Sequence, residues 1–144
     1  MKVKGLMGIF IIGLVLLVPL AGAVSAGDVQ IIANKNVSIS YISPDMLKDI
    51  FLGKKNTWDN GASIYFVTLD SGQPHDDFLK TYLQKSNAQF NNYWKKQVFT
   101  GQGSMPKTFS SDKAMIDFVA GTNGAIGYVS GTADTGTVKI ITVK

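Results

Sequence analysis

The sequence predicts a single α/β domain over residues 27–144, and three observations support that prediction. Short apolar runs with strand character alternate with segments whose apolar residues recur at helical spacing. No repeat or low-complexity tract interrupts them. The length suits one domain with one core. Interleaved strands and helices are typical of an α/β fold with a sheet flanked by helices.

The first elements are two strands and a helix. Residues 29–34 form an apolar strand, and residues 37–42 predict a half-buried strand or extended segment because apolar side chains alternate there. A helix begins at residues 43–45, where Ser43 caps, Pro44 suits the first turn and Asp45 complements the helix dipole. Gly53 ends it. Its expected apolar face comprises Leu47, Ile50 and Phe51.

The middle of the chain predicts a loop, a strand and two helices. Residues 54–61 form a polar loop with a turn at Asn60-Gly61, and residues 63–69 form the strongest strand. A helix is expected over about 74–84, and a second follows the Ser86-Asn87 cap. Their expected inward residues are Phe78, Leu79, Tyr82 and Leu83 on the first helix, and Phe90, Tyr93, Trp94 and Val98 on the second.

The last third predicts a long loop, a helix and two strands. The loop spans residues 100–109, and Ser110 or Ser111 caps a helix that Gly121 ends. Its expected apolar residues are Met115, Phe118 and Val119. Residues 124–130 and 138–143 close the sheet as strands.

Residues 1–26 predict a signal peptide. Lys2 and Lys4 precede an apolar run, and Val24 and Ala26 fit the −3 and −1 positions of a signal-peptidase site. The alternative is an uncleaved anchor, because residues 6–24 are just long enough to span a bilayer. Cleavage predicts a periplasmic or secreted domain, residues 27–144, without a membrane segment.

Composition excludes several classes of function. Cysteine is absent, so neither a disulfide nor a cysteine nucleophile is possible. All acids are Asp and all strong bases are Lys, and removal of Lys2 and Lys4 lowers the formal net charge from +4 to +2. The lysines are scattered, whereas a nucleic-acid surface needs a basic stripe. No paired histidines, metal-ligand spacing or nucleophile elbow is present, so we predict no enzyme activity, metal or cofactor.

Several landmarks occur in one order: "IIANKNV", "LKDIFLGKKNTWDNG", a Phe and a Tyr-Trp pair on consecutive helices, "FTGQGSMPK" and "GAIGYV". This run, from about residue 29 to 129, resembles the phosphate-binding-protein-like family, the extracytoplasmic receptors of ABC transporters. The resemblance implies the type II periplasmic-binding-protein fold, in which two lobes clamp a ligand. The chain resembles one such lobe, a mixed sheet flanked by about four helices.

The resemblance also implies an anion site in the loop "VTLDSGQPHDDF". In the family an Arg precedes a Ser-Gly-Thr turn at a helix start, and here Ser71 and Gly72 match the first two positions. Gln73 stands in place of Thr, and no Arg exists in the chain. The loop therefore predicts either weak oxyanion contact at Ser71, Gly72 and Gln73, or a plain strand-to-helix turn.

Other candidate residues favour structural roles. His75 has Asp70, Asp76 and Asp77 nearby, but neighbouring helical residues diverge, so we predict a solvent-exposed histidine and no metal site. Trp58 is expected to pin its loop to the domain. Tyr93 and Trp94 fit the core better than a sugar-stacking surface with Phe99. The glycines of residues 121–127 are expected to end a helix and turn into a strand.

Two functions remain open. The first is a non-catalytic extracytoplasmic solute-binding-like domain that binds a small, phosphate-like oxyanion weakly at most. The second is a non-binding protein-interaction or assembly module of the cell envelope. Self-association or an envelope partner is expected if strand edges near residues 31–34 and 138–143 stay open, although Lys35, Lys139 and Lys144 can protect such edges. A hydrolase is a third, weaker alternative.

Overall fold

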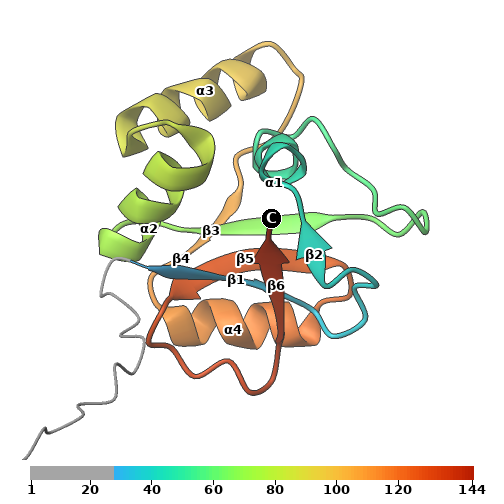
Figure 1. Ribbon diagram of the computed structural model, residues 1–144. Coiled ribbons are helices and arrows are strands. Elements are labelled where there is room, and N and C mark those ends of the chain that lie inside the picture. The colour runs from blue at the N-terminus through green and yellow to red at the C-terminus, as the bar shows by residue number, and fades with distance from the viewer. Residues whose placement is uncertain (1–27) are drawn as a thin grey trace, which may run out of the picture.

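The computed structural model describes residues 28–144 and has three layers, with α1, α2 and α3 on one face of a sheet and α4 on the other (Figure 1). The predicted signal segment, residues 1–26, lies outside the described residues. The helices are α1 (Pro44–Phe51), α2 (Gln73–Phe78), the π-helix η1 (Leu79–Leu83), α3 (Asn87–Phe99) and α4 (Asp112–Gly121). The strands are β1 (Val29–Ala33), β2 (Tyr41–Ile42), β3 (Tyr65–Leu69), β4 (Lys107–Phe109), β5 (Ala125–Ser130) and β6 (Lys139–Val143).

The sheet is mixed, as predicted, with the strand order β2-β6-β1-β5-β3-β4 over residues 28–144. β3 pairs in parallel with β4 and β5, whereas β1 pairs antiparallel with β5 and β6. The carboxyl ends of β3, β4 and β5 therefore lie at one edge, where β3 leads into α2 and β4 into α4 (Figure 1). In open α/β sheets this edge is where ligands bind.

The capping signals that predict the helices hold in the structure. The Ser43 hydroxyl accepts a hydrogen bond from the backbone N–H of Met46 at 3.1 Å, with Pro44 in the first turn. At α3, Ser86 and Gln89 form a complete capping box, each side chain accepting from the other's backbone N–H. These bonds satisfy donors that a helix start otherwise leaves free.

One open alternative is decided by the structure, and one loop prediction needs correction. Only Tyr41 and Ile42 of the expected segment 37–42 form a strand, because the pairing with β6 reaches only its last two residues. Tyr41 is 58% exposed, so the expected alternation does not hold at that end. The long loop over 100–109 contains β4, a three-residue edge strand that pairs with β3.

The helix expected over 74–84 is divided. α2 ends at Phe78, and in η1 the backbone N–H groups of Gln84 and Lys85 both donate to the Leu79 carbonyl. Gln84 then adopts a left-handed conformation (φ 51°), which ends the helical segment. The wider turn keeps Leu79 and Leu83 buried against the sheet.

One core lies mainly between the sheet and α1–α3. The Phe78 ring stacks on Tyr128 with 3.8 Å between centroids, and Phe51 meets Phe78 edge to face at 4.7 Å. Each such buried aromatic or aliphatic side chain contributes about 1.5–3 kcal/mol to stability. On the other face, a Cβ at Gly127 would lie 2.6 Å from the Met115 sulfur, so glycine there permits α4 to pack closely.

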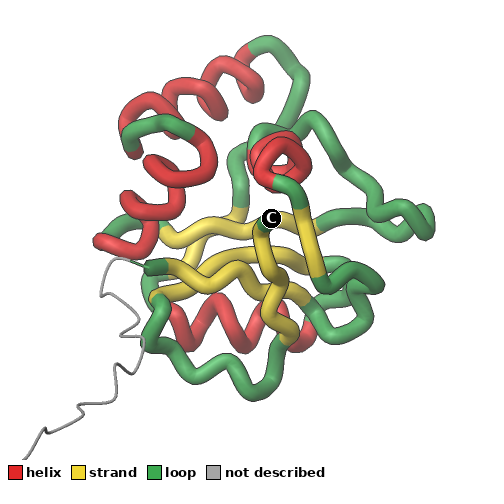
Figure 2. The backbone as a smooth tube through the Cα atoms, viewed as in Figure 1, coloured by secondary structure: helices red, strands yellow, loops and turns green. Residues whose placement is uncertain are grey.

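α3 extends beyond this core (Figure 2). Phe90 and Trp94 are buried as predicted, but Val98, which was expected to face inward, is 44% exposed. Phe99, the last residue of α3, is 92% exposed. The predicted helical spacing of these apolar residues is correct, but the last residues of α3 do not pack on the core.

Candidate functional site

The loop between β3 and α2 is the predicted anion site. Gly72 is the N-cap residue of α2 with φ 98°, a conformation that favours glycine, and no side chain caps this helix. The Ser71 hydroxyl donates to the Asp70 carboxylate at 3.0 Å, and the Gln73 amide donates to the Asp77 carboxylate at 2.7 Å. Both polar side chains of the expected site are therefore bonded to carboxylates.

The charge around this loop opposes an anion. Asp76 lies in the first turn of α2, Asp77 follows it within the helix, and Asp70 precedes the helix start. Pro74, at the second helical position, has no backbone N–H to donate. α2 is also only six residues long, so its dipole offers little to a ligand. The loop therefore offers few donors to an anion and places three carboxylates near it.

His75 is buried, with 2% of its surface exposed, and the prediction of a solvent-exposed histidine is wrong. Its Nδ1 lies 2.5 Å from the Tyr128 hydroxyl, which accepts from the backbone N–H of Leu69 at 3.1 Å. The Tyr128 hydroxyl can therefore donate its own proton to Nδ1 of His75. The other ring nitrogen, Nε2, lies 3.0 Å from the Asn87 side-chain oxygen and donates to it. The network uses both nitrogens of a neutral imidazole.

Tyr128 fixes this network from the middle of the sheet. Burial is the main cause that raises the pKa of its hydroxyl far above the ordinary value of a tyrosine, and the nearby Asp76 carboxylate raises the pKa further. The hydrogen bond with Leu69 acts in the opposite direction. Tyr128 therefore remains a neutral donor. The arrangement positions α2 over the sheet and leaves no ring nitrogen of His75 for a metal or a proton transfer.

A pocket of about 220 Å³ lies beside this network, at the carboxyl ends of β3 and β4. The strands supply its floor, α2 and α3 supply two walls, and the loop before β4 supplies a third. Its lining residues are Thr68, Leu69, Asp70, His75, Phe90, Asn91, Met105, Pro106 and Thr108. Sequence reasoning did not find this pocket, because its residues come from two strands, two helices and the loops beside them.

The remaining candidate residues have structural positions. Trp58 is 3% exposed and its indole N–H donates to the Gly124 carbonyl at 3.1 Å, which confirms that it pins its loop. Gly124 has φ 80°, and a Cβ there would lie 2.2 Å from the Ser63 carbonyl oxygen. Glycine is thus required at the turn into β5. Trp94 is buried and Tyr93 is half-buried against the core, as predicted, whereas Phe99 is exposed.

The described residues hold no cluster of three or more carboxylates or histidines that could bind a metal ion. No helix within residues 28–144 is both long and apolar enough to cross a bilayer.

Comparison with known proteins identifies the fold. No family model matches the chain, and no curated protein matches it. Solved structures do match: PstS from Borrelia burgdorferi, with 18% identity and a TM-score of 0.64, and a phosphate-binding protein from Stenotrophomonas maltophilia, with 20% identity and a TM-score of 0.59. An ABC-type phosphate transport receptor from Vibrio cholerae matches with 17% identity and a TM-score of 0.54.

The chain has the fold of phosphate-transport receptors. The matches cover 80–81% of this chain but only 45%, 47% and 39% of the Vibrio, Borrelia and Stenotrophomonas proteins. The chain thus spans less than half the length of the receptors it matches. The predicted periplasmic-binding-protein fold is confirmed, and at these identities the comparison supports the fold alone.

Proposed function

We propose that the chain is a non-catalytic, extracytoplasmic solute-binding domain that binds phosphate-like oxyanions only weakly, at Ser71, Gly72 and Gln73. The receptor fold supports the binding role. The observation that carries the weak affinity is the bonding of Ser71 to Asp70 and of Gln73 to Asp77. A phosphate must displace these contacts and meet the same carboxylates.

The expected affinity follows from the donors that remain. The chain has no Arg for a bidentate clamp, and the loop residues are exposed, so each hydrogen bond to an anion competes with water. We expect a dissociation constant for phosphate in the millimolar range or weaker, a binding free energy of about −4 kcal/mol at most.

Calorimetric titration with phosphate, sulfate and molybdate at low salt tests this proposal. Removal of one opposing charge by Asp76→Asn should strengthen phosphate binding about two- to fivefold, as for other charges at a helix start. Asp45→Asn, which removes an exposed first-turn carboxylate at α1, is the matched control and should have no effect. Micromolar binding by the wild-type protein, or equal effects of both variants, would contradict the proposal.

The extracytoplasmic location rests on the signal segment. Intact-mass measurement on protein from the periplasm or medium should give a chain that begins at Gly27. A full-length mass in the membrane fraction would support the alternative of an uncleaved anchor.

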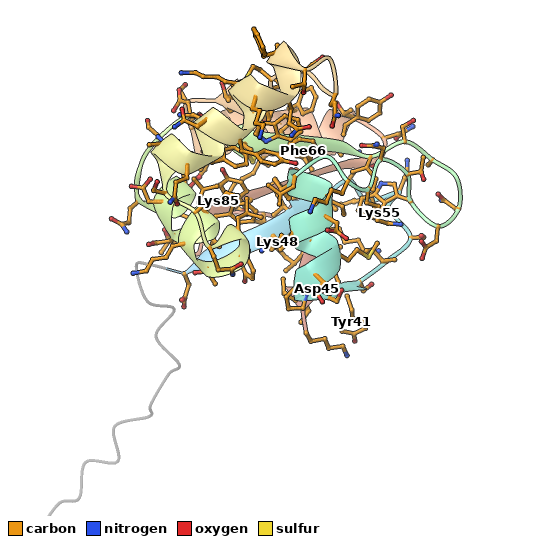
Figure 3. The ribbon with its side chains drawn as sticks, turned by 90° about the horizontal axis from the view of Figure 1, so that it is seen from above. Tyr41, Asp45, Lys48, Lys55, Phe66 and Lys85 are labelled. Atoms are coloured by element: carbon orange, nitrogen blue, oxygen red, sulfur yellow. The ribbon has the colours of Figure 1, made fainter. Side chains whose placement is uncertain are left out.

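The second candidate, a protein-interaction module, is favoured by the open end of α3. Phe99 is 92% exposed beside Val98, so the end of α3 presents two apolar side chains to solvent. The strand edges are less open than expected, because β1 lies between β5 and β6 and is not an edge. At the β2 edge, Lys144 lies 3.6 Å over the ring of the outward-pointing Tyr41 (Figure 3).

Light scattering across a concentration series tests this second candidate. If α3 carries the interface, Phe99→Ser should abolish any concentration-dependent mass increase, whereas Tyr41→Ser should not. A wild-type monomer at every concentration, with no partner captured from envelope extracts, would exclude it.

A further inference from the structure

The pocket at the carboxyl ends of β3 and β4 has a floor of two threonines. Thr68 and Thr108 are register partners on parallel strands, so their side chains lie on the same face of the sheet, about 5 Å apart. That face also carries Phe66, which packs on Phe51 and Trp94 beneath α1 and α3. Thr68 therefore lies buried under the helical layer, whereas Thr108, on the edge strand, is exposed.

Of the three buried polar residues within 28–144, only Thr68 has a side chain without a hydrogen bond, and two further buried atoms, Asp77 Oδ2 and Trp94 Nε1, also lack a partner. The three residues are Asn34, Thr68 and His75. Asn34 donates to the Val119 and Ala120 carbonyls, and His75 is bonded through both nitrogens. Thr68 is 1% exposed, yet no group in the described chain bonds to its hydroxyl. Because Thr68 lines the pocket, its hydroxyl keeps a donor and an acceptor for a group that enters there.

The polar atoms left in this pocket are mostly acceptors. Asp70 supplies a carboxylate at its mouth, of which one oxygen accepts from Ser71. Asn91 uses its amide nitrogen on Asn87 and keeps its carbonyl oxygen unbonded. No lysine is among the described residues that line the pocket, and both nitrogens of His75 are occupied. The pocket therefore offers negative charge and acceptors to a donor.

The walls set the size of the ligand. Phe90, Met105 and Pro106 give an apolar surface next to these acceptors, and a pocket of about 220 Å³ is smaller than most drug-sized sites. A group of a few carbon atoms fits there. A zwitterion would bring a carboxylate that meets Asp70 without a cation to balance it.

We propose that this pocket binds a small primary ammonium compound, with the ammonium group between Asp70, Asn91 and the Thr68 hydroxyl and the short carbon chain against Phe90 and Met105. The proposal rests on the proposed solute-binding role, but it uses a different set of residues from the oxyanion loop and the opposite charge. The fold of the phosphate receptors would then hold, in this chain, a site selective for cations.

Two-dimensional NMR titration of the isotope-labelled domain with ethylammonium chloride tests this inference. We expect saturable shifts of the Thr68, Asp70 and Thr108 amides, with a dissociation constant in the millimolar range because Asp70 is exposed. Ethanol, the neutral analogue, should bind at least about tenfold more weakly, since charge-assisted bonds are about twice as strong as neutral ones. Sodium chloride at the same ionic strength should cause no saturable shift.

Three variants assign the contacts. Asp70→Asn removes the charge but keeps the acceptor for Ser71, and should weaken ethylammonium binding about tenfold. Thr68→Val keeps the shape and removes the hydroxyl, and should weaken it several-fold. Asp45→Asn, an exposed carboxylate outside the pocket, should leave binding unchanged. Thermal melts of each variant confirm that it is folded.

The outcomes separate this inference from the proposed function. Equal binding of ethanol and ethylammonium, or no loss in Asp70→Asn, would overturn the ammonium site while leaving the oxyanion result untouched. Phosphate that shifts the Ser71–Gln73 amides with micromolar affinity would instead overturn the proposed function. No saturable shift with ethylammonium up to 100-fold above the protein concentration and into the tens of millimolar would also overturn the ammonium site.

Discussion

Two buried polar groups lie side by side beneath α2, and they differ in one respect. The hydroxyl of Tyr128 is bonded to Leu69 and His75, and the network continues to Asn87. The hydroxyl of Thr68, on the neighbouring strand, has no partner in the described chain. The first group stabilises the fold, whereas the second lines a pocket. A buried hydroxyl that is hydrogen-bonded within the protein holds the fold together, whereas an unbonded hydroxyl in a pocket is available to a ligand.

If this contrast is right, the hydrogen-bonded network of His75 and Tyr128 contributes more to the free energy of unfolding than Thr68 does. Truncation by His75→Ala leaves a cavity and removes the partner of both Tyr128 and Asn87. We expect a loss of about 3–5 kcal/mol in the free energy of unfolding, measured by urea denaturation. Gln73→Ala, on the exposed side of the same helix, should cost less than about 1 kcal/mol. Equal effects of the two variants would show that the network does not stabilise the domain.

Removal of one hydroxyl by Tyr128→Phe isolates the hydrogen bonds from the packing. The Leu69 N–H and the His75 Nδ1 atom then lose their partner in a dry environment. We expect a loss of about 2–4 kcal/mol, because each buried unsatisfied group costs about 1–3 kcal/mol. Tyr41→Phe is the matched control on an exposed tyrosine, and it should change stability by less than about 0.5 kcal/mol.

The same variant gives a pH-dependent prediction. The pKa of Tyr128 is raised by burial, so the folded state binds its proton more tightly than the unfolded state does. This contribution is complete below the pKa of an unfolded tyrosine, about 10, and is lost as the pH rises above it. The stability advantage of the wild-type protein over Tyr128→Phe should therefore shrink above pH 10, by at most about 1.4 kcal/mol per pH unit. A constant difference from pH 7 to 11 would contradict the assignment.

The smallest expected effect belongs to Thr68. Thr68→Val replaces an unbonded hydroxyl by a methyl group, so stability should stay within about 0.5 kcal/mol or rise by about 1 kcal/mol. Thr68→Ser keeps the hydroxyl, loses the methyl group and should cost about 0.8 kcal/mol. A loss above about 1.5 kcal/mol in Thr68→Val would show that the hydroxyl is bonded, and the contrast with Tyr128 would disappear.

Local patterns predict much of this fold, because caps and periodicity are properties of neighbouring residues. Ser43, Ser86 and Ser111 mark three helix starts, and strands β1, β3, β5 and β6 follow apolar runs. β4 was missed because its three residues are held by pairing with β3 and have no strong strand pattern of their own.

The candidate site shows the limit of local reasoning. His75 lies in the first turn of a helix with carboxylates nearby, which is typical of an exposed residue. Its burial is decided by Tyr128, 53 residues later in the chain. A tyrosine within the apolar run of β5 does signal that a polar partner is needed, but it does not identify that partner. The Thr68–Thr108 pair is likewise visible only once the register of β3 and β4 is known.

The antiparallel strand β1 has a consequence for folding. It is the first strand of the described chain, and both of its neighbours, β5 and β6, come from the last twenty residues. The centre of the sheet cannot assemble until the C-terminal segment has been synthesised. Strand β1 is made first among the described strands, but it pairs only with β5 and β6, which are made last. Such long sequence separation between partners slows folding, since loop closure must precede the contacts that reward it.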